Sequence, residues 1–485
     1  MNDNDFEEKE YEAKEYRVKV EKEKTKDLID YIAEDLIDQF TFKHFVKNGN
    51  SIGLYMWDGK RFVECEEEVK AIIEENYSEE HKITNHIVNE VVDKIKRRTY
   101  HELTEDNDLV IAFDNGIFDW TDLLTDNVYL KSFEEYTKEL REGITNIIPF
   151  IYIPHELNVA LLSKLMEYKD VDIENEKRII EQLEPDITNV FKQWVNDKWL
   201  ILYEIIGFSL YPKYAIPKAF MLYGEGSNGK TTFVNLLVKI LSEENITNIA
   251  LQVLCNEHYR FTKSLLYNKL ANIYDDLPKN PIYEMGAFKM LTGLSPIEAD
   301  RKFREPIKFY NFAKMIFSTN QLPKISDYTL AILRRWILIE FPNKFPNNAF
   351  FFDTVFTEEK IKRIIAISIW TFYLALKRNS FSYEIGIEEI AEKWRRNSEP
   401  LYDFIESMIE QKILIRDNEG KVEKEYLYSL YTKWCNENDL ETKSKREFTI
   451  KLEEYGITQV HDGKTNQFYY KGIRKVEDKT QNILG

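Results

Sequence analysis

Short apolar runs alternate with segments of helical periodicity between residues 216 and 345. The runs at 220–223, 269–274, 313–318 and 335–341 are almost wholly apolar, which is typical of strands buried on both faces. Strands that alternate with helices predict a parallel α/β sheet. Functional groups gather at the carboxyl ends of the strands in such a sheet, so we expect the chemistry of this region directly after the runs.

The chain before this region divides into three segments. Residues 1–40 carry dense alternating charge and then a helical run, as expected for a solvated helix or tail. Residues 41–155 mix helices with strand–turn–strand patterns and predict an α/β domain. Residues 156–215 are helical, and we expect one run from Ile187 to Ile206 that ends at Gly207 and Pro212.

The chain after this region contains a long helix and a small domain. The apolar stretch from Ile364 to Leu376 closes the segment 216–395 and is too short to cross a bilayer, so we expect a buried helix. Residues 396–485 predict three helices followed by a β-hairpin, a winged-helix pattern, and the basic residues at the start of the third helix suit a DNA groove. These residues are Lys443, Lys445 and Arg446. The alternative is a small interaction domain with the same architecture.

The run at 220–223 leads into a glycine-punctuated loop and then a helix at 233–241. The loop is Gly224-Glu225-Gly226-Ser227-Asn228-Gly229-Lys230-Thr231-Thr232. A strand, the pattern G-x-x-x-x-G-K-T and a helix in this order form the phosphate-binding loop of ATP-binding proteins. The alternative is a chance glycine turn, which would require neither the strand before it nor the helix after it. The three glycines allow positive φ, so that backbone N–H groups can converge on phosphate oxygens. We expect Lys230 to reach the β- and γ-phosphates and the Thr231 hydroxyl to bind Mg²⁺.

Polar residues follow the later runs as well. Asp275 and Asp276 follow the second run and fit a pair in which one carboxylate holds Mg²⁺ and the other polarises the attacking water; their order does not say which does which. Asn320 follows the third run and fits a polar sensor that orients the water or contacts the γ-phosphate, with an exposed turn asparagine as the alternative. Arg334 and Arg335 lead into the apolar part of the fourth run, where an arginine finger for a neighbouring subunit, or a plain surface pair, is expected.

Composition narrows the class of protein. With 43% hydrophobic residues, the 485-residue chain can bury several cores, which argues against a disordered protein. The net charge of −18 argues against a protein that coats nucleic acid, but it permits a locally basic channel. The three cysteines lie far apart and the seven histidines form no closely spaced pair, so we expect no site in which protein side chains alone hold a metal. The acidic start of the chain is unlike a signal peptide, so we expect a soluble, cytoplasmic protein that does not associate with a membrane.

Several stretches together resemble the superfamily 3 helicases, in particular the poxvirus-type and phage or plasmid primase–helicase branch. They are the loop at 224–232, residues 289–303 (KMLTGLSPIEADRKF), residues 317–323 (FSTNQLP) and the pair Arg334-Arg335. The segment around Phe113-Asp114-Asn115-Gly116-Ile117 is similar to the domain that precedes the helicase in this branch.

The resemblance implies an α/β fold with an AAA+-type P-loop ATPase core, an N-terminal α/β plus helical domain and a C-terminal winged-helix domain. It implies a ring, of six subunits in most relatives, that encircles single-stranded DNA and unwinds forked duplex DNA with ATP and Mg²⁺. Arg301, Lys302 and Phe303 fall where the family places a hairpin in the ring channel, and Arg335 is preferred to Arg334 as the finger. No polymerase-type primase domain precedes residue 40, so we expect either unwinding without priming or a separate primase or polymerase as partner.

Two other functions fit parts of this pattern. An initiator or loader would use ATP to remodel DNA without processive unwinding, and ATP turnover without strand displacement would identify it. A P-loop kinase for small molecules would be a monomer indifferent to DNA, and it leaves residues 289–303 and Arg335 without a role. We therefore expect an ATP-dependent replicative DNA helicase of a virus, plasmid or mobile element.

Overall fold

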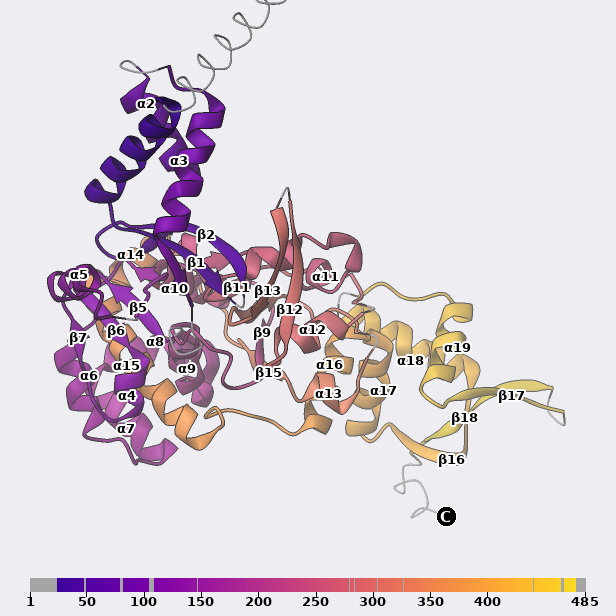
Figure 1. Cartoon of the computed structure of the whole chain (residues 1–485). Coiled ribbons are helices and arrows are strands. Elements are labelled where there is room, and N and C mark those ends of the chain that lie inside the picture. Colours follow the sequence, from indigo (N-terminus) through magenta and orange to yellow (C-terminus); the bar gives the residue numbers. More distant parts are fainter. Residues whose placement is uncertain are drawn as a thin grey trace, which may run out of the picture.

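A five-stranded parallel sheet organises the middle of the chain (Figure 1). Its strands, in spatial order, are β10 (Ile246–Thr247), β11 (Ala271–Tyr274), β14 (Lys314–Thr319), β9 (Ala219–Tyr223) and β15 (Trp336–Glu340). Every neighbouring pair runs parallel, as the apolar runs predict. The computed structural model describes residues 24–47, 49–78, 82–103, 109–145, 147–278, 280–282, 284–302, 304–325, 327–438, 440–463 and 466–476.

The two faces of this sheet belong to different hydrophobic cores. Successive strand residues point to opposite faces, so Phe220 and Leu222 of β9 enter one core and Met221 and Tyr223 enter the other. The first face is covered by α9 (Leu200–Ser209), α10 (Lys230–Leu241) and α15 (Glu358–Arg378). The second is covered by α11 (Leu251–Leu254), α12 (Gly286–Leu291) and α16 (Ile387–Ser398). Burial on both faces explains why these strands are almost wholly apolar.

The helical segment before the sheet differs from the single run expected between Ile187 and Ile206. It contains α6 (Val159–Met166), α7 (Ile173–Leu183), α8 (Pro185–Val195) and α9, and Asn196 interrupts the run with a φ of 56°. The expectation that Gly207 ends the helix is wrong, because α9 continues to Ser209. A Cβ on Gly207 would lie 1.9 Å from the carbonyl oxygen of Ser368, so this glycine lets α9 and α15 approach closely.

The helix α15 contains the apolar stretch from Ile364 to Leu376 and is buried along most of its length, as predicted. Searching the described part of the chain finds no helix with the length and apolar character that a membrane span needs. The core that α15 shares with α9 and the sheet also takes in Ile111 and Phe113, so parts of the segments 41–155, 156–215 and 216–395 pack together.

The N-terminal part contains two further sheets and a group of helices (Figure 1). One sheet has the order β3 (Phe62–Glu64), β2 (Asn50–Trp57), β1 (Phe42–Lys47), β4 (Tyr100–Glu102), and the other has the order β7 (Leu130–Lys131), β6 (Gly116–Asp119), β5 (Val110–Phe113), β8 (Tyr152–Ile153). Its helices are 24–39, α2 (Glu66–Tyr77), α3 (Asn85–Arg98), α4 (Trp120–Leu124) and α5 (Phe133–Glu142). Both hairpins predicted from turn residues form, namely β2–β3 and β5–β6.

Residues after the sheet form the small C-terminal unit. Its elements are α17 (Pro400–Glu410), β16 (Leu414–Glu423), α18 (Lys424–Glu437), α19 (Lys445–Glu454), β17 (Thr458–Asp462) and β18 (Gln467–Lys475). The three predicted helices and the hairpin are present, and β16 adds a strand that the sequence analysis did not identify. β16 pairs with β18 and completes a three-stranded sheet in the order β16-β18-β17.

Candidate functional site

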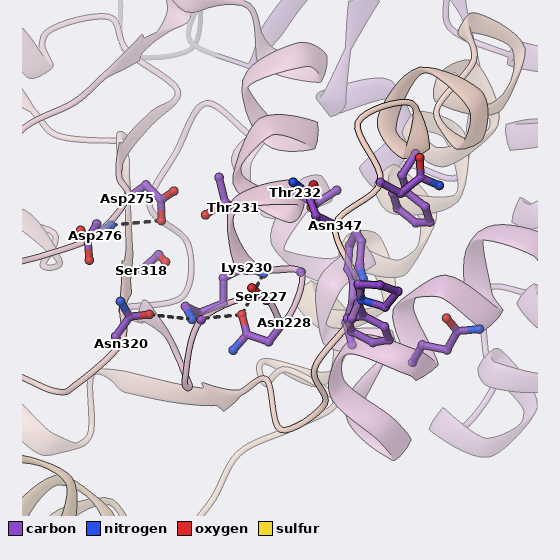
Figure 2. A pocket seen from close by; sticks show the side chains of 18 of the residues that line it. Ser227, Asn228, Lys230, Thr231, Thr232, Asp275, Asp276, Ser318, Asn320 and Asn347 are labelled. Carbon is purple, nitrogen blue, oxygen red and sulfur yellow. Dashed lines mark hydrogen bonds between the residues drawn. The ribbon is translucent and has the colours of Figure 1, made fainter. Parts of the chain in front are cut away.

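A cavity of about 660 Å³ opens at the carboxyl ends of β9, β11 and β14 (Figure 2). Its lining includes, from the predicted site, Gly226, Ser227, Asn228, Gly229, Lys230, Thr231, Thr232, Asp275, Asp276 and Asn320. Because the strands are parallel, their carboxyl ends meet at one edge of the sheet. The topology therefore brings three polar segments, far apart in the sequence, around one space.

The conformation of the loop that lines this cavity depends on residues with positive φ and on a hydrogen bond to Phe341. Gly224 and Gly229 have φ values of +145° and +94°, but Gly226 does not have a positive φ, and Ser227 does, at 61°. Of the three glycines that allow a positive φ, Gly224 and Gly229 thus adopt it, and Ser227 adopts it in place of Gly226. The side-chain amide of Asn228 donates to the carbonyl oxygen of Phe341 at 2.9 Å, which fixes the loop to the segment that follows β15.

Lys230, the first residue of α10, is 5% exposed. Its Nζ donates to the carbonyl oxygen of Gly224, to Oδ1 of Asn228 at 3.0 Å and to Oδ1 of Asn320 at 3.3 Å. These acceptors are neutral. Burial lowers the pKa of the Lys230 ammonium, and the carboxylates of Asp275 and Asp276 oppose that effect. An anionic phosphate in the cavity would be a charge partner for this ammonium.

The carboxylate pair lies across the cavity from the loop. Asp275 is half-buried, and its Oδ1 accepts the backbone N–H of Asp276 at 3.0 Å. Asp276 is exposed and has a φ of 55°. Figure 2 shows the Asp275 side chain on the side of Thr231, with Asp276 pointing the other way. Carboxylate and hydroxyl oxygens are ligands that Mg²⁺ accepts, so Thr231 and Asp275 form a suitable donor set.

Ser318 and Thr319 of β14 also line the cavity, and the remaining wall consists of residues that the sequence pattern did not indicate. Five of them come from the segment after β15, namely Phe345, Pro346, Asn347, Asn348 and Phe351, and two from α8, namely Gln193 and Trp194. The backbone N–H of Phe345 donates to the carbonyl oxygen of Ser227 at 2.7 Å, and Lys344 pairs with Glu225 at 2.6 Å. Trp194 lies under the loop, because a Cβ on Gly229 would lie 2.5 Å from its indole nitrogen. These contacts place aromatic rings and side-chain amides beside the loop.

The arginine pair lies away from this cavity. Arg334 and Arg335 precede β15, whereas the cavity follows the strands, so they lie at the other end of the sheet. Arg334 is exposed and has no ion pair with any residue that the structure describes. Arg335 is half-buried and donates to the carbonyl oxygen of Ala331, and burial lowers its pKa. Neither guanidinium reaches the cavity of its own subunit.

The residues predicted to contact DNA occupy two places. Arg301 and Lys302 lie at the tip of a hairpin formed by β12 (Pro296–Arg301) and β13 (Arg304–Tyr310), which stands out from the sheet in Figure 1. Phe303 lies outside the described residues. Lys443, Lys445 and Arg446 lie at the start of α19, where Lys445 pairs with Glu425 at 2.5 Å.

Three family models match the chain. One described as "D5 N terminal like" matches residues 36–200, and one described as "Poxvirus D5 protein-like" matches residues 396–481. A family of unknown function, DUF5906, matches residues 222–335. No curated protein sequence matches the chain significantly.

Solved structures show similarity at low identity. Two apo structures of the NrS-1 C-terminal region are each 14% identical to this chain. The match to the first covers 92% of this chain and 99% of the NrS-1 chain, with a TM-score of 0.37. The match to the second covers 91% of this chain and 98% of the NrS-1 chain, with a TM-score of 0.38. A ligand-bound JCV helicase is 14% identical over 52% of this chain and 72% of its own, with a TM-score of 0.24. The family assignment therefore rests on the sequence models.

The two D5 models match residues before and after the central sheet, and together they span more than half of the chain. The segment around Phe113 lies inside the first match, and the other stretches that resemble the poxvirus-type branch, between 224 and 335, lie between the two matches. The chain belongs to the D5-type superfamily 3 helicases.

Proposed function

We propose that this protein is an ATP-dependent helicase that hydrolyses ATP in the cavity beside Lys230 and moves along single-stranded DNA through a ring of its own copies. The observation that carries the proposal is the meeting of Lys230, Thr231, Asp275, Asp276 and Asn320 around one cavity. Membership of a family of replicative helicases of viruses and phages supports the same conclusion.

Each polar side chain has a role that follows from its position. The backbone N–H groups of residues 226–230 and the N-terminus of α10 bind the phosphates. Lys230 exchanges its neutral acceptors for the β- and γ-phosphates and neutralises charge that develops during phosphoryl transfer. Asn320 contacts Lys230 at 3.3 Å and is positioned to orient the attacking water.

Magnesium fits the oxygen donors of this site. Thr231 and Asp275 would hold it, and Mg²⁺ would supply neutralisation of the phosphate charge. Asp276 remains to polarise the water. The position of Asp275 on the side of Thr231 supports this assignment of the two carboxylates (Figure 2).

A neighbouring subunit completes the site in this proposal. The described residues that line the cavity include Lys230 as their cationic side chain and no arginine. A head-to-tail contact would bring the end of one sheet that carries Arg334 to the cavity of the next copy, and such contacts close into rings. We favour Arg334 over Arg335 as the finger, because Arg334 is exposed whereas Arg335 is engaged with Ala331.

The remaining parts contact the nucleic acid. Arg301 and Lys302 at the tip of the β12–β13 hairpin would follow the DNA backbone in the ring channel. The order α17-β16-α18-α19-β17-β18 fits a winged-helix domain of an AAA+-type helicase, with Lys443, Lys445 and Arg446 at the start of the helix expected to face DNA.

The test is ATP turnover by the purified chain with and without a single-stranded oligonucleotide. We expect turnover that requires Mg²⁺ and rises when the oligonucleotide is present. Turnover that is indifferent to nucleic acid, from a protein that stays a monomer with ATP, would favour the small-molecule kinase instead.

A further inference from the structure

A second cavity, of about 420 Å³, lies at the opposite end of the central sheet from the first. Its lining comes from the segments that precede β9 and β14, from the base of the β12–β13 hairpin and from Lys47 at the end of β1. The cavity is thus placed where the N-terminal part of the chain meets the sheet and the hairpin.

The chemistry of this cavity suits a nucleic acid. Two lysines, Lys47 and Lys213, line it, and no aspartate or glutamate is present among the described residues that do so. Lys213 is exposed, and the ring of Tyr310 is 55% exposed. Phosphate groups are attracted to lysine, and bases stack on exposed aromatic rings regardless of their sequence.

Backbone carbonyl groups of the cavity wall are already engaged. Lys314, which is fully buried, donates from Nζ to the carbonyl oxygens of Tyr211 and Phe312. Both residues line the cavity. These two carbonyl groups are therefore directed to the buried Nζ of Lys314 rather than toward an anionic ligand.

The exposed side of the hairpin connects this cavity with the hairpin tip. Lys308 and Tyr310 alternate along β13 and are both exposed, while Ile307 before them and Phe309 between them are buried. Alternate residues of a strand lie about 7 Å apart on one face. Glu298 lies opposite Lys308, and Pro296 lies opposite Tyr310. Asp300, two residues after Glu298, is the next acidic residue along β12 and pairs with Arg260 at 3.3 Å. A basic and aromatic path thus runs from Arg301 through Lys308 to Tyr310 and Lys213.

We propose that this cavity is a second binding site for single-stranded nucleic acid, in which a base stacks on Tyr310 while neighbouring phosphates contact Lys213 and Lys47. The inference rests on the proposed function and extends it, since the strand would pass between the N-terminal part and the ATPase sheet on its way to the hairpin tip.

The test measures binding of fluorescein-labelled dT30 and U30 by fluorescence anisotropy over a range of salt concentrations. Tyr310→Ala should weaken binding about tenfold, and Tyr310→Phe, which keeps the ring, should bind like the parent protein. Lys213→Ala should lower the slope of log affinity against log salt by about 0.7. Lys164→Ala and Tyr168→Ala on and after α6 are matched controls, because both side chains are exposed and lie away from the cavity.

The outcomes separate this inference from the proposed function. Weaker binding by Tyr310→Ala and Lys213→Ala, with unchanged controls, supports the site, and a larger effect with dT30 than with U30 identifies DNA as its ligand. If the parent hydrolyses ATP and binds dT30 while both cavity variants bind equally well, the inference is overturned and the helicase proposal stands. A Tyr310→Ala protein that changes its oligomeric mass but not its affinity would make this cavity a protein interface and also overturn the inference.

Discussion

Replacing Arg334 with alanine tests whether the site is shared between subunits. Arg334 is exposed and makes no ion pair with a described residue, so its loss should change the stability of the subunit by less than about 0.5 kcal/mol. An arginine finger contributes about 10³-fold or more to turnover, which is roughly 4 kcal/mol of transition-state stabilisation. We therefore expect Arg334→Ala to fold normally, to bind ATP and to hydrolyse it at least about a thousandfold more slowly.

The assay mixes this variant with Lys230→Ala, which keeps the finger but loses the phosphate contact. In a ring with head-to-tail contacts, an interface is intact when Arg334→Ala supplies the cavity and Lys230→Ala supplies the arginine. Equal random mixing makes about a quarter of the interfaces intact, so up to about a quarter of the parent ATP turnover should return.

Two results would refute this reasoning. Mixtures that stay as inactive as the separate variants would show that no arginine is exchanged between subunits. Near-parental turnover by Arg334→Ala alone would exclude this residue, and the same experiment with Arg335→Ala would then test the finger that the sequence favoured. That second variant needs a melting curve, because Arg335 is half-buried and its loss removes packing as well as charge.

Other predictions concern the cavity and the buried core. Lys230→Ala should reduce ATP hydrolysis more than about a hundredfold. Turnover comparable to that of the parent protein would show that the loop does not take part in hydrolysis. Gly207→Ala should lower the melting temperature, since its Cβ would lie 1.9 Å from the carbonyl oxygen of Ser368; Gly386→Ala, where a Cβ meets nothing within 4 Å, is the control and should melt like the parent. Glu176 and Glu204 are both fully buried around Arg378, and burial raises the pKa of each carboxyl. The folded state thus keeps protons that the unfolded state releases, so the melting temperature should fall as the pH rises from about 4.5 to about 8, and Glu176→Gln should flatten this dependence; an equal slope in the variant would contradict the assignment.

The part of the candidate site that is local in sequence could be predicted. Gly229-Lys230-Thr231 needs only a strand before it and a helix after it, and Asp275 and Asn320 follow apolar runs whose parallel order brings their ends together. The backbone conformation within the loop could not be predicted residue by residue, because a positive φ falls on Ser227 and not on Gly226. Any residue that lacks a bulky branch can take up this strain when the surrounding hydrogen bonds fix the loop.

The cavity wall formed by residues 345–351 could not be predicted, because its phenylalanines, proline and asparagines match no motif and become part of the site only through the fold. Phe345 reaches its place through a hydrogen bond to Ser227, more than a hundred positions earlier, and periodicity says nothing about such contacts. The role of Gly207 was missed for the same reason, because it depends on a contact with a residue far along the chain. A glycine near the end of an apolar run indicates a helix end by local rules, but here it serves the approach of α15 from far along the chain. The strand β16 was missed because Arg416-Asp417-Asn418-Glu419-Gly420 interrupts its apolar pattern.

The helicase proposal is tested most directly by strand displacement from a forked duplex carrying a single-stranded arm, with ATP turnover recorded in the same samples. We predict that the parent chain releases the displaced strand only when ATP and Mg²⁺ are present, and that Lys230→Ala releases none. ATP turnover that rises with DNA while the duplex stays intact would contradict this prediction and identify a protein that remodels DNA without unwinding it.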